Sequence, residues 1–139
     1  MPSPHVLIVE DDQFLSDAYR AELKKHRYDV TMATDGEEAL TAVHKKKPDL
    51  IILDLAMPKK NGVEVLRDWH KQGLTPKIPV VVASNLENPD VRETCLKLGA
   101  CDYIIKSNIT LPDLINLCNK YLSRETAPKK TKKAKKTTS

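Results

Sequence analysis

Short apolar runs alternate along this chain with longer segments in which apolar residues recur at helical spacing. Five of the runs are strand-like, because they are continuous and bounded by polar or turn residues. They span residues 5–9, 30–33, 50–53, 79–83 and 103–105. Each is followed by a segment of helical period, at about residues 13–26, 36–46, 62–72, 89–98 and 111–122. The pattern therefore predicts five successive strand–helix units.

Residues that commonly begin helices stand where this pattern requires them. Thr34, Asn61 and Thr110 each precede an acidic residue by three positions, as in a capping box. Asn88 precedes a proline at the first helical position. Apolar strands joined by helices form a parallel sheet covered on both faces, and right-handed crossovers make it doubly wound. We therefore expect an α/β fold, a flavodoxin-like five-stranded parallel sheet of order 2-1-3-4-5 with five helices.

Charge divides the 139 residues into two parts. Residues 1–123 hold 16 Lys and Arg against 18 Asp and Glu, whereas residues 124–139 hold seven basic residues and one acidic residue. The apolar period also stops after Leu122. We therefore expect a folded domain over residues 1–123 and a disordered, Lys-rich basic tail over residues 124–139. Two functions of the tail stay open: a solubilising segment, or non-specific electrostatic contact with nucleic acid or another polyanion.

The composition does not point to a membrane or to an oxidising compartment. No apolar run approaches the ~20 residues of a transmembrane helix, and the N-terminus lacks the layout of a signal peptide. The three cysteines form no CxxC pair, and the four histidines are scattered singly, so zinc-site spacing is absent. We therefore expect a cytoplasmic protein whose cysteines behave as small apolar residues.

Charged or hydroxyl side chains mark the carboxyl ends of four of the five predicted strands, the edge at which open α/β sheets bind ligands. In chain order they are Glu10, Asp11 and Asp12 after the first strand, Asp54 after the third, Ser84 after the fourth and Lys106 after the fifth. Asp12 is better explained as the cap of the first helix. Solvent exposure of a strand end could account for any one of the other residues. It does not easily account for all of them together.

The chemistry of this set favours a metal and a phosphoryl group. Glu10, Asp11 and Asp54 would crowd three carboxylates together, so at least one would protonate unless a cation were bound. Mg²⁺ prefers such oxygen ligands together with phosphate oxygens. A carboxylate can accept a phosphoryl group as an acyl phosphate when a metal and a lysine neutralise the incoming oxygens. Ser84 and Lys106 would donate hydrogen bonds to the resulting phosphate.

Residues 4–123 resemble the receiver domain of bacterial-type response regulators. The matching segments are VLIVEDD at residues 6–12, IILDLAMPKKNG at 51–62, VVVAS at 80–84 and GACDYIIKS at 99–107. Each motif alone is weak, but all of them in this order and at these spacings are highly specific. The resemblance implies a single-domain response regulator of a two-component phosphorelay, a switch rather than a conventional enzyme. It would promote its own phosphotransfer and its slow self-dephosphorylation.

The resemblance also implies a role for each matching residue. Asp54 would be the phosphoacceptor, assisted by Lys106 and Ser84. The Mg²⁺ ligands would be Glu10, Asp11, Asp54 and the carbonyl of Ala56. Tyr103 fills the position of the aromatic residue that moves inward when the phosphate draws the Ser84 hydroxyl toward it.

Three departures from the family pattern stand beside these matches. Ser107 follows the lysine where the family has a proline with a cis bond; since a cis bond before a non-proline residue costs ~3–4 kcal/mol, we expect a trans bond and an altered loop. Asn85 follows the switch hydroxyl where a small residue is usual, and it would narrow access to the phosphate. Ala56 and Leu86 replace polar groups that often orient the hydrolytic water.

Other functions of such a fold fit the residues less well. The acidic run 10–12 would repel the phosphate of a flavodoxin-type cofactor, and a haloacid-dehalogenase-type phosphatase needs an acid where Ala56 stands. The main alternative is a pseudo-receiver, a constitutive protein-binding adaptor of the same fold. For the switch, the implied partners are a sensor histidine kinase or phosphotransfer protein and a downstream protein target. The target would dock on the face of the fourth helix, fifth strand and fifth helix.

Overall fold

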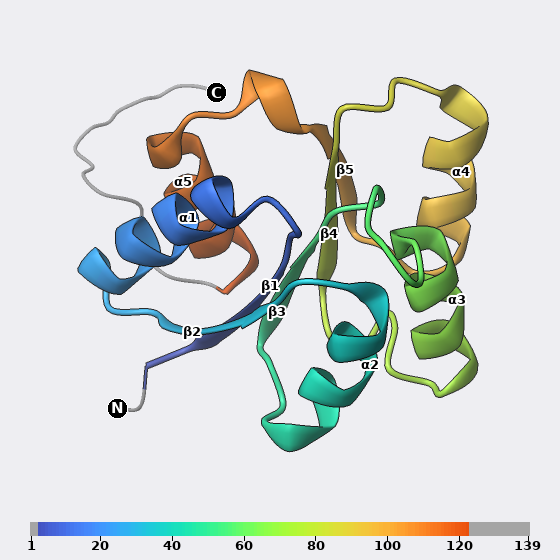
Figure 1. Ribbon diagram of the computed structural model, residues 1–139, viewed down its shortest axis with the longest axis horizontal. Coiled ribbons are helices and arrows are strands. Elements are labelled where there is room, and N and C mark those ends of the chain that lie inside the picture. Colours follow the sequence, from blue (N-terminus) through green and yellow to red (C-terminus); the bar gives the residue numbers. More distant parts are fainter. Residues whose placement is uncertain (1–2, 123–139) are drawn as a thin grey trace.

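The structure, a computed structural model, describes residues 3–122 and is built on one five-stranded parallel sheet (Figure 1). The strand order is β2-β1-β3-β4-β5, which confirms the predicted order 2-1-3-4-5. The strands are β1 (His5–Val9), β2 (Asp29–Ala33), β3 (Leu50–Leu53), β4 (Val80–Ser84) and β5 (Asp102–Ile105). The Lys-rich segment 124–139, for which we predicted disorder, lies outside the described residues.

Five α-helices connect and follow the strands, as predicted. They are α1 (Gln13–Lys25), α2 (Gly36–Lys45), α3 (Gly62–Lys71), α4 (Pro89–Lys97) and α5 (Leu111–Tyr121). A short 3₁₀ turn, η1 (Lys106–Asn108), lies between β5 and α5. Helices α1 and α5 cover one face of the sheet, and α2, α3 and α4 cover the other (Figure 1). None of the helices in the described residues 3–122 has the length and hydrophobicity of a membrane-spanning segment.

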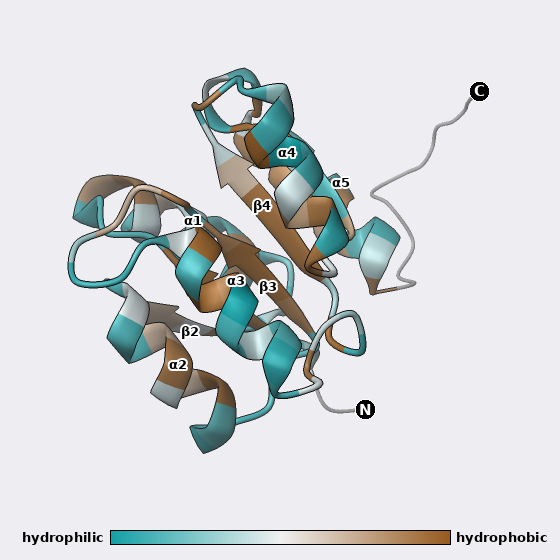
Figure 2. Ribbon diagram, turned by 90° about the vertical axis from the view of Figure 1, so that its right-hand side faces the viewer, coloured by the Kyte–Doolittle hydropathy of each residue, from teal (hydrophilic) through white to brown (hydrophobic). Residues whose placement is uncertain are grey.

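Alternate residues of each central strand enter two separate hydrophobic cores. Leu7 and Val9 of β1 pack on the side of α2, α3 and α4, whereas Val6 and Ile8 pack on the side of α1 and α5. All positions of β1, β3 and β4 are buried, as expected for parallel strands covered on both faces. In Figure 2, β3 and β4 are accordingly hydrophobic along their length, while the surrounding helices carry hydrophilic segments.

The helix caps agree with the sequence at four positions and differ at one. Asp12 caps α1, as predicted, and accepts a hydrogen bond from the Leu15 N–H at 3.0 Å. Asn61 and Thr110 form complete capping boxes, and Asn88 accepts hydrogen bonds from the first turn of α4. The cap of α2 is Asp35, not Thr34 as the spacing predicted. Thr34 and Asp35 could each cap this helix. The carboxylate of Asp35 accepts a hydrogen bond from the backbone N–H of residue 38 at 2.8 Å.

Candidate functional site

Three carboxylates meet at the carboxyl edge of the sheet. Glu10 and Asp11 follow β1, and Asp54 follows β3, whose last residues are aligned because Val9 pairs with Leu53. One oxygen from each carboxylate lies within 4.8 Å of the others. Glu10 and Asp54 are buried, whereas Asp11 is exposed and gives the cluster an opening to solvent. The structure therefore brings the three predicted acidic residues together.

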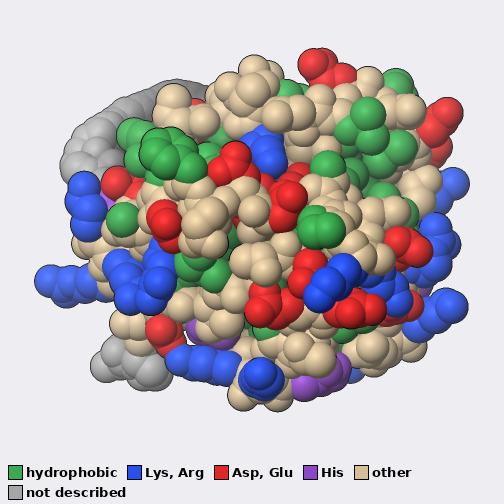
Figure 3. All heavy atoms as spheres, viewed as in Figure 1, with side chains coloured by type: hydrophobic (Ala, Val, Ile, Leu, Met, Phe, Trp, Pro, Cys, Tyr) green, Lys and Arg blue, Asp and Glu red, His purple; other side chains and the backbone are tan. Residues whose placement is uncertain are grey.

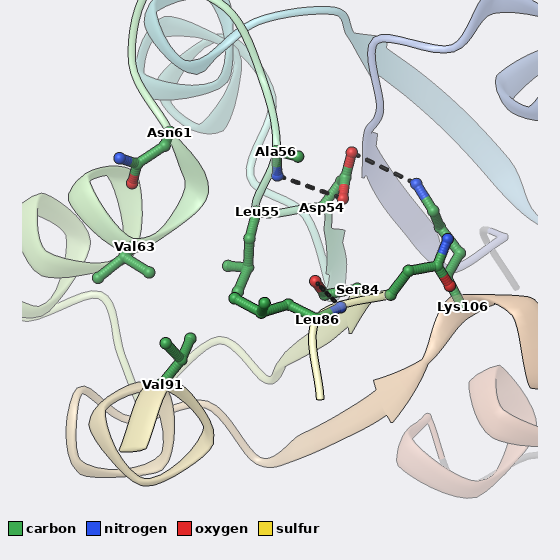
Figure 4. A pocket seen from close by; sticks show the side chains of 10 residues that line it. Asp54, Leu55, Ala56, Asn61, Val63, Ser84, Leu86, Val91 and Lys106 are labelled. Atoms are coloured by element: carbon green, nitrogen blue, oxygen red, sulfur yellow. Dashed lines mark hydrogen bonds and ion pairs between the residues drawn. The ribbon is translucent and has the colours of Figure 1, made fainter. Parts of the chain in front are cut away.

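Lys106 reaches this cluster from the end of β5. Its Nζ donates a hydrogen bond to Glu10 Oε1 at 2.9 Å and lies 3.4 Å from Asp54 Oδ2 (Figure 4). The backbone N–H groups of Asp12 and Ala56 also donate to the cluster, to Glu10 at 3.1 Å and to Asp54 at 3.4 Å. One lysine thus faces three carboxylates, and the surplus charge is negative.

Burial governs the ionisation of these groups. Loss of solvation raises the pKa of Glu10 and of Asp54 above their ordinary values, although the Lys106 ammonium pulls both pKa values down. Burial also lowers the pKa of Lys106, but its hydrogen bond to Glu10 and the charge of Asp54 outweigh this and leave the pKa raised. The site therefore holds protons tightly and has a deficit of positive charge.

A divalent cation would correct this deficit, and the donor set suits Mg²⁺. Glu10, Asp11 and Asp54 offer hard carboxylate oxygens, and the exposed side of Asp11 leaves room for the water ligands that Mg²⁺ retains. The carbonyl of Ala56, two residues beyond Asp54, is the expected fourth protein ligand.

Ser84 lines the same cavity as Asp54, and it is linked to Tyr103 through one loop residue, Leu86. The buried Ser84 accepts a hydrogen bond from the Leu86 N–H at 3.1 Å, which leaves its own hydroxyl hydrogen free to donate (Figure 4). The Tyr103 hydroxyl donates to the Leu86 carbonyl at 2.6 Å, and the Tyr103 side chain is buried. The two predicted switch residues are therefore hydrogen-bonded to the N–H and the carbonyl of Leu86, which lies in the loop between β4 and α4.

Asn85 and Ser107, two of the residues that depart from the pattern named above, are in direct contact. The Ser107 backbone N–H donates to Asn85 Oδ1 at 2.8 Å. The sole cis peptide bond within residues 3–122 is Thr75–Pro76, so the bond between Lys106 and Ser107 is trans, as predicted. Sequence reasoning noted both residues but missed the contact, since they lie 22 positions apart in two loops.

A cavity of about 530 Å³ opens beside Asp54, and its lining divides into two kinds (Figure 4). Asp54, Ser84 and Lys106 lie together on one side, and Ala56 lies beside Asp54. The lining across from Lys106 is mostly apolar, with Leu55, Val63, Leu86 and Val91, and the polar Asn61 lies beside Val63. A ligand on Asp54 would therefore have hydrogen-bond donors on one side and hydrocarbon on the other.

Comparison with known proteins gives a single family. A model of the response regulator receiver domain matches residues 6–119. Over 101 residues the chain is 39% identical to the alkaline phosphatase synthesis transcriptional regulatory protein PhoP of Bacillus subtilis, which covers 73% of this chain and 41% of that protein. It is 35% identical over 106 residues to a probable transcriptional regulator of Porphyridium aerugineum, covering 76% of this chain and 43% of that protein. The chain thus spans about two fifths of the length of these relatives.

Solved structures agree with this assignment. The receiver domain of the Francisella response regulator 1452 superposes with a TM-score of 0.80 at 29% identity, covering 87% of this chain and 98% of that one. A CheY-like receiver domain protein from Methanospirillum hungatei superposes with a TM-score of 0.80 at 26% identity, covering 87% and 94%.

Proposed function

The chain belongs to the response regulator receiver domain family, and from this membership we propose that it is a phosphorylation switch with Asp54 as its acceptor. The observation that carries the proposal is the contact set at the sheet edge: Asp54 is buried beside Glu10 and Asp11 and within 3.4 Å of Lys106. Receiver domains are signalling components of two-component systems, and this arrangement supplies the groups that such phosphotransfer needs.

In the proposed reaction an Asp54 carboxylate oxygen attacks the phosphorus of a phosphodonor. A new P–O bond forms as the bond to the leaving group breaks, and the leaving group keeps the electron pair and takes up a proton from solvent. Glu10, Asp11 and Asp54, with the Ala56 carbonyl, would hold Mg²⁺, which supplies positive charge to the phosphoryl oxygens when bound. Lys106, which lies 3.4 Å from Asp54, would donate a hydrogen bond to a phosphoryl oxygen.

The acyl phosphate would then act through the loop that follows β4. The free hydroxyl hydrogen of Ser84 is available to a phosphoryl oxygen, and movement of Ser84 disturbs its hydrogen bond with Leu86. Because Tyr103 holds the carbonyl of the same residue, a change at Ser84 reaches the Tyr103 side chain. This link is the route by which phosphorylation would alter a surface remote from Asp54.

We propose a histidine kinase or phosphotransfer protein as the phosphodonor and a downstream protein as the target. The target surface would be the face of α4, β5 and α5. A second cavity of about 400 Å³ adjoins this face and is lined by Glu87, Asn88, Pro89, Arg92, Tyr103 and Ile105. Its lining includes the switch residue Tyr103, which supports a link between the phosphorylation state and target binding.

The direct test uses purified protein, Mg²⁺ and a small phosphodonor such as acetyl phosphate, with intact mass as the readout. We expect one added, base-labile phosphoryl group that depends on Mg²⁺ and is absent from the Asp54→Asn protein. Labelling of Asp54→Asn to the wild-type level would move the acceptor elsewhere. Labelling of the wild type without Mg²⁺ would contradict the metal site.

A pseudo-receiver is the second candidate, and one observation favours it. Tyr103 is buried and its hydroxyl donates a hydrogen bond to the Leu86 carbonyl at 2.6 Å. An adaptor that binds its target constitutively would have its switch residue fixed in this way. The same labelling experiment separates the two functions, since a folded protein that takes up no phosphoryl group from any donor is the result expected of an adaptor.

A further inference from the structure

Asn85 and Ser107 each stand directly after a residue of the proposed phosphoryl site. Asn85 follows Ser84, and Ser107 follows Lys106. The hydrogen bond of 2.8 Å between the Ser107 N–H and Asn85 Oδ1 therefore joins the two loops that carry the phosphoryl-binding side chains. A proline at position 107 has no N–H to donate, so the contact requires a residue other than proline there.

This contact fixes which end of the Asn85 amide is available. The amide is planar, with an oxygen that accepts and a nitrogen that can donate two hydrogen bonds. Its oxygen is engaged by Ser107, and within residues 3–122 its nitrogen Nδ2 has no hydrogen-bond partner. Asn85 lines the same cavity as Asp54, Ser84 and Lys106. An unengaged donor is therefore held at the mouth of the phosphoacceptor cavity.

A phosphoryl group on Asp54 would need such a donor. It carries a charge of about −1.5 to −2 and three acceptor oxygens. Lys106, the one cation in contact with Asp54 among the described residues, already donates to Glu10 at 2.9 Å. Ser84 has a single hydroxyl hydrogen. A further neutral N–H adds a hydrogen bond to a charged oxygen, which is stronger than a bond between neutral groups.

We propose that Asn85 is an additional phosphoryl-binding residue, whose Nδ2 donates to a phosphoryl oxygen on Asp54 while the Ser107 N–H holds the amide in that orientation. The inference rests on the proposed function, since it requires Asp54 to carry the group. Asn85 would then bind the phosphoryl group directly. If only its size mattered, Asn85 would do no more than restrict access to that group.

The experiment measures binding of beryllofluoride, which coordinates a carboxylate as a phosphoryl mimic, in the presence of Mg²⁺. Titration calorimetry and ¹⁹F NMR give the Kd for the full-length wild type and for variants at position 85. Asn85→Ala removes the donor, and we expect binding about tenfold weaker or more. Asn85→Asp keeps an acceptor for the Ser107 N–H but places a carboxylate beside the bound anion, so we expect it to bind more weakly still.

Ser107→Ala is the matched control, because it changes the side chain and keeps the backbone N–H. Its Kd should equal that of the wild type. Asn85 is exposed and its variants should fold, which thermal unfolding verifies for each protein. The lifetime of the acyl phosphate after removal of the phosphodonor gives a second readout, and Asn85→Ala should shorten it.

Each remaining outcome overturns the inference in a recognisable way. If Asn85→Ala binds beryllofluoride as tightly as the wild type, or more tightly, Asn85 only restricts access and the phosphorylation switch still stands. If Asn85→Asp matches the wild type while Asn85→Ala is weakened, the side chain only ties the loops together. If the folded wild type does not bind beryllofluoride at all, the proposed function itself fails and this inference with it.

Discussion

At the scale of single residues, the carboxylates at the sheet edge are held together against their mutual repulsion. Glu10 and Asp54 are 3% and 4% exposed, so water screens them little, and Lys106 is the one ammonium within reach among the described residues. Such an arrangement costs folding free energy unless protons or a cation neutralise it. The site is therefore maintained for binding, at the expense of stability.

This cost can be measured with Asp54→Asn. Burial raises the pKa of Asp54 above its ordinary value of 3.8, so the folded state binds this proton more tightly than the unfolded state. The stability of the wild type should therefore fall as the pH rises from that value through the raised pKa. Asn cannot ionise, so at pH 7 without Mg²⁺ we expect Asp54→Asn to be more stable by on the order of 1 kcal/mol. Urea unfolding at several pH values measures the difference.

The stability advantage of Asp54→Asn over the wild type should vanish below the ordinary pKa of Asp. There the Asp54 carboxyl group is protonated in both the folded and the unfolded state. Addition of Mg²⁺ provides the control, because a ligand that binds the folded state stabilises it. Mg²⁺ should raise the unfolding temperature of the wild type more than that of Asp54→Asn. A wild type more stable than Asp54→Asn at pH 7 would show that the ion pair with Lys106 outweighs desolvation.

The apolar side of the cavity predicts a long-lived acyl phosphate. Ala56 and Leu86 have no group that could position an attacking water, and both line the cavity beside Asp54. Leu86→Glu should shorten the lifetime, by up to about 10²-fold if the carboxylate positions water as an acid–base group does. Leu86→Met is the matched control and should keep the wild-type lifetime. The decay of the phosphorylated mass after removal of the donor measures both. An unchanged rate in Leu86→Glu would mean that access past Asn85 limits hydrolysis.

How far the sequence predicts the site depends on which atoms are involved. Glu10, Asp54 and Lys106 were predicted to meet, because strand ends in a parallel sheet share an edge whatever the details of packing. The hydrogen bond between Asn85 and Ser107 was not predicted, because it joins two loops whose separation depends on backbone angles that no periodicity encodes. The Tyr103–Leu86 bond was also missed, because the position of the Leu86 carbonyl depends on the backbone angles of the loop after β4.

At the scale of elements, the start of α3 is fitted closely to the loop that carries Asp54. Asn61 and residue 64 form a capping box, and the Gly62 N–H donates to the Leu55 carbonyl at 2.9 Å. A Cβ at Gly62 would lie 2.4 Å from the Asp54 carbonyl oxygen and 2.7 Å from the Leu55 Cα. These are backbone atoms, which cannot move aside without moving the phosphoacceptor.

Gly62→Ala should therefore damage both stability and the site. We expect a loss of about 3 kcal/mol in the free energy of unfolding, as for overpacking against fixed backbone, together with weaker Mg²⁺ binding. Gly73→Ala is a useful comparison. Gly73 has φ of +77° but no atom within 4 Å of an added Cβ, so only backbone strain of about 1 kcal/mol is expected. Urea unfolding of both variants checks the order. An equal loss of unfolding free energy in both variants would show that the loop beside Asp54 can shift to accommodate the added Cβ.

The strands and helices also show how precisely the sequence predicts where each element begins and ends. Apolar periodicity placed all ten strands and helices, and the structure moves their ends by no more than one residue. Asp35 replaced Thr34 as the cap of α2, because neighbouring polar residues compete for the same helix start and only the local geometry decides between them.

At the scale of the whole molecule, the fold separates charge between the two edges of the sheet. First-turn acids and last-turn bases follow the helix dipoles. The acids are Glu37, Glu38, Glu64, Asp90 and Asp113. The bases are Lys24, Lys25, His44, Lys45, His70, Lys71, Lys97 and Lys120. In Figure 3, Asp and Glu side chains lie across the face, and many Lys and Arg side chains lie toward its borders. The helix ends therefore contribute acids to the Asp54 edge and bases to the opposite edge.

The Lys-rich segment follows α5, whose last turn lies at that basic edge because each helix returns antiparallel to the strands. Six lysines between positions 129 and 136 add no aromatic or base-reading group, so contact with duplex DNA would ignore sequence. We expect binding at low salt that weakens steeply toward physiological salt, with a slope of up to about −5 in log Kobs against log salt.

Deletion of residues 124–139 should abolish this binding and leave phosphorylation of Asp54 intact, since α5 ends at Tyr121. Fluorescence anisotropy with two unrelated duplexes measures the binding, and intact mass measures the phosphorylation. Equal binding by the truncated and full-length proteins at low salt would assign the contact to the domain's basic edge and leave the tail a solubilising segment.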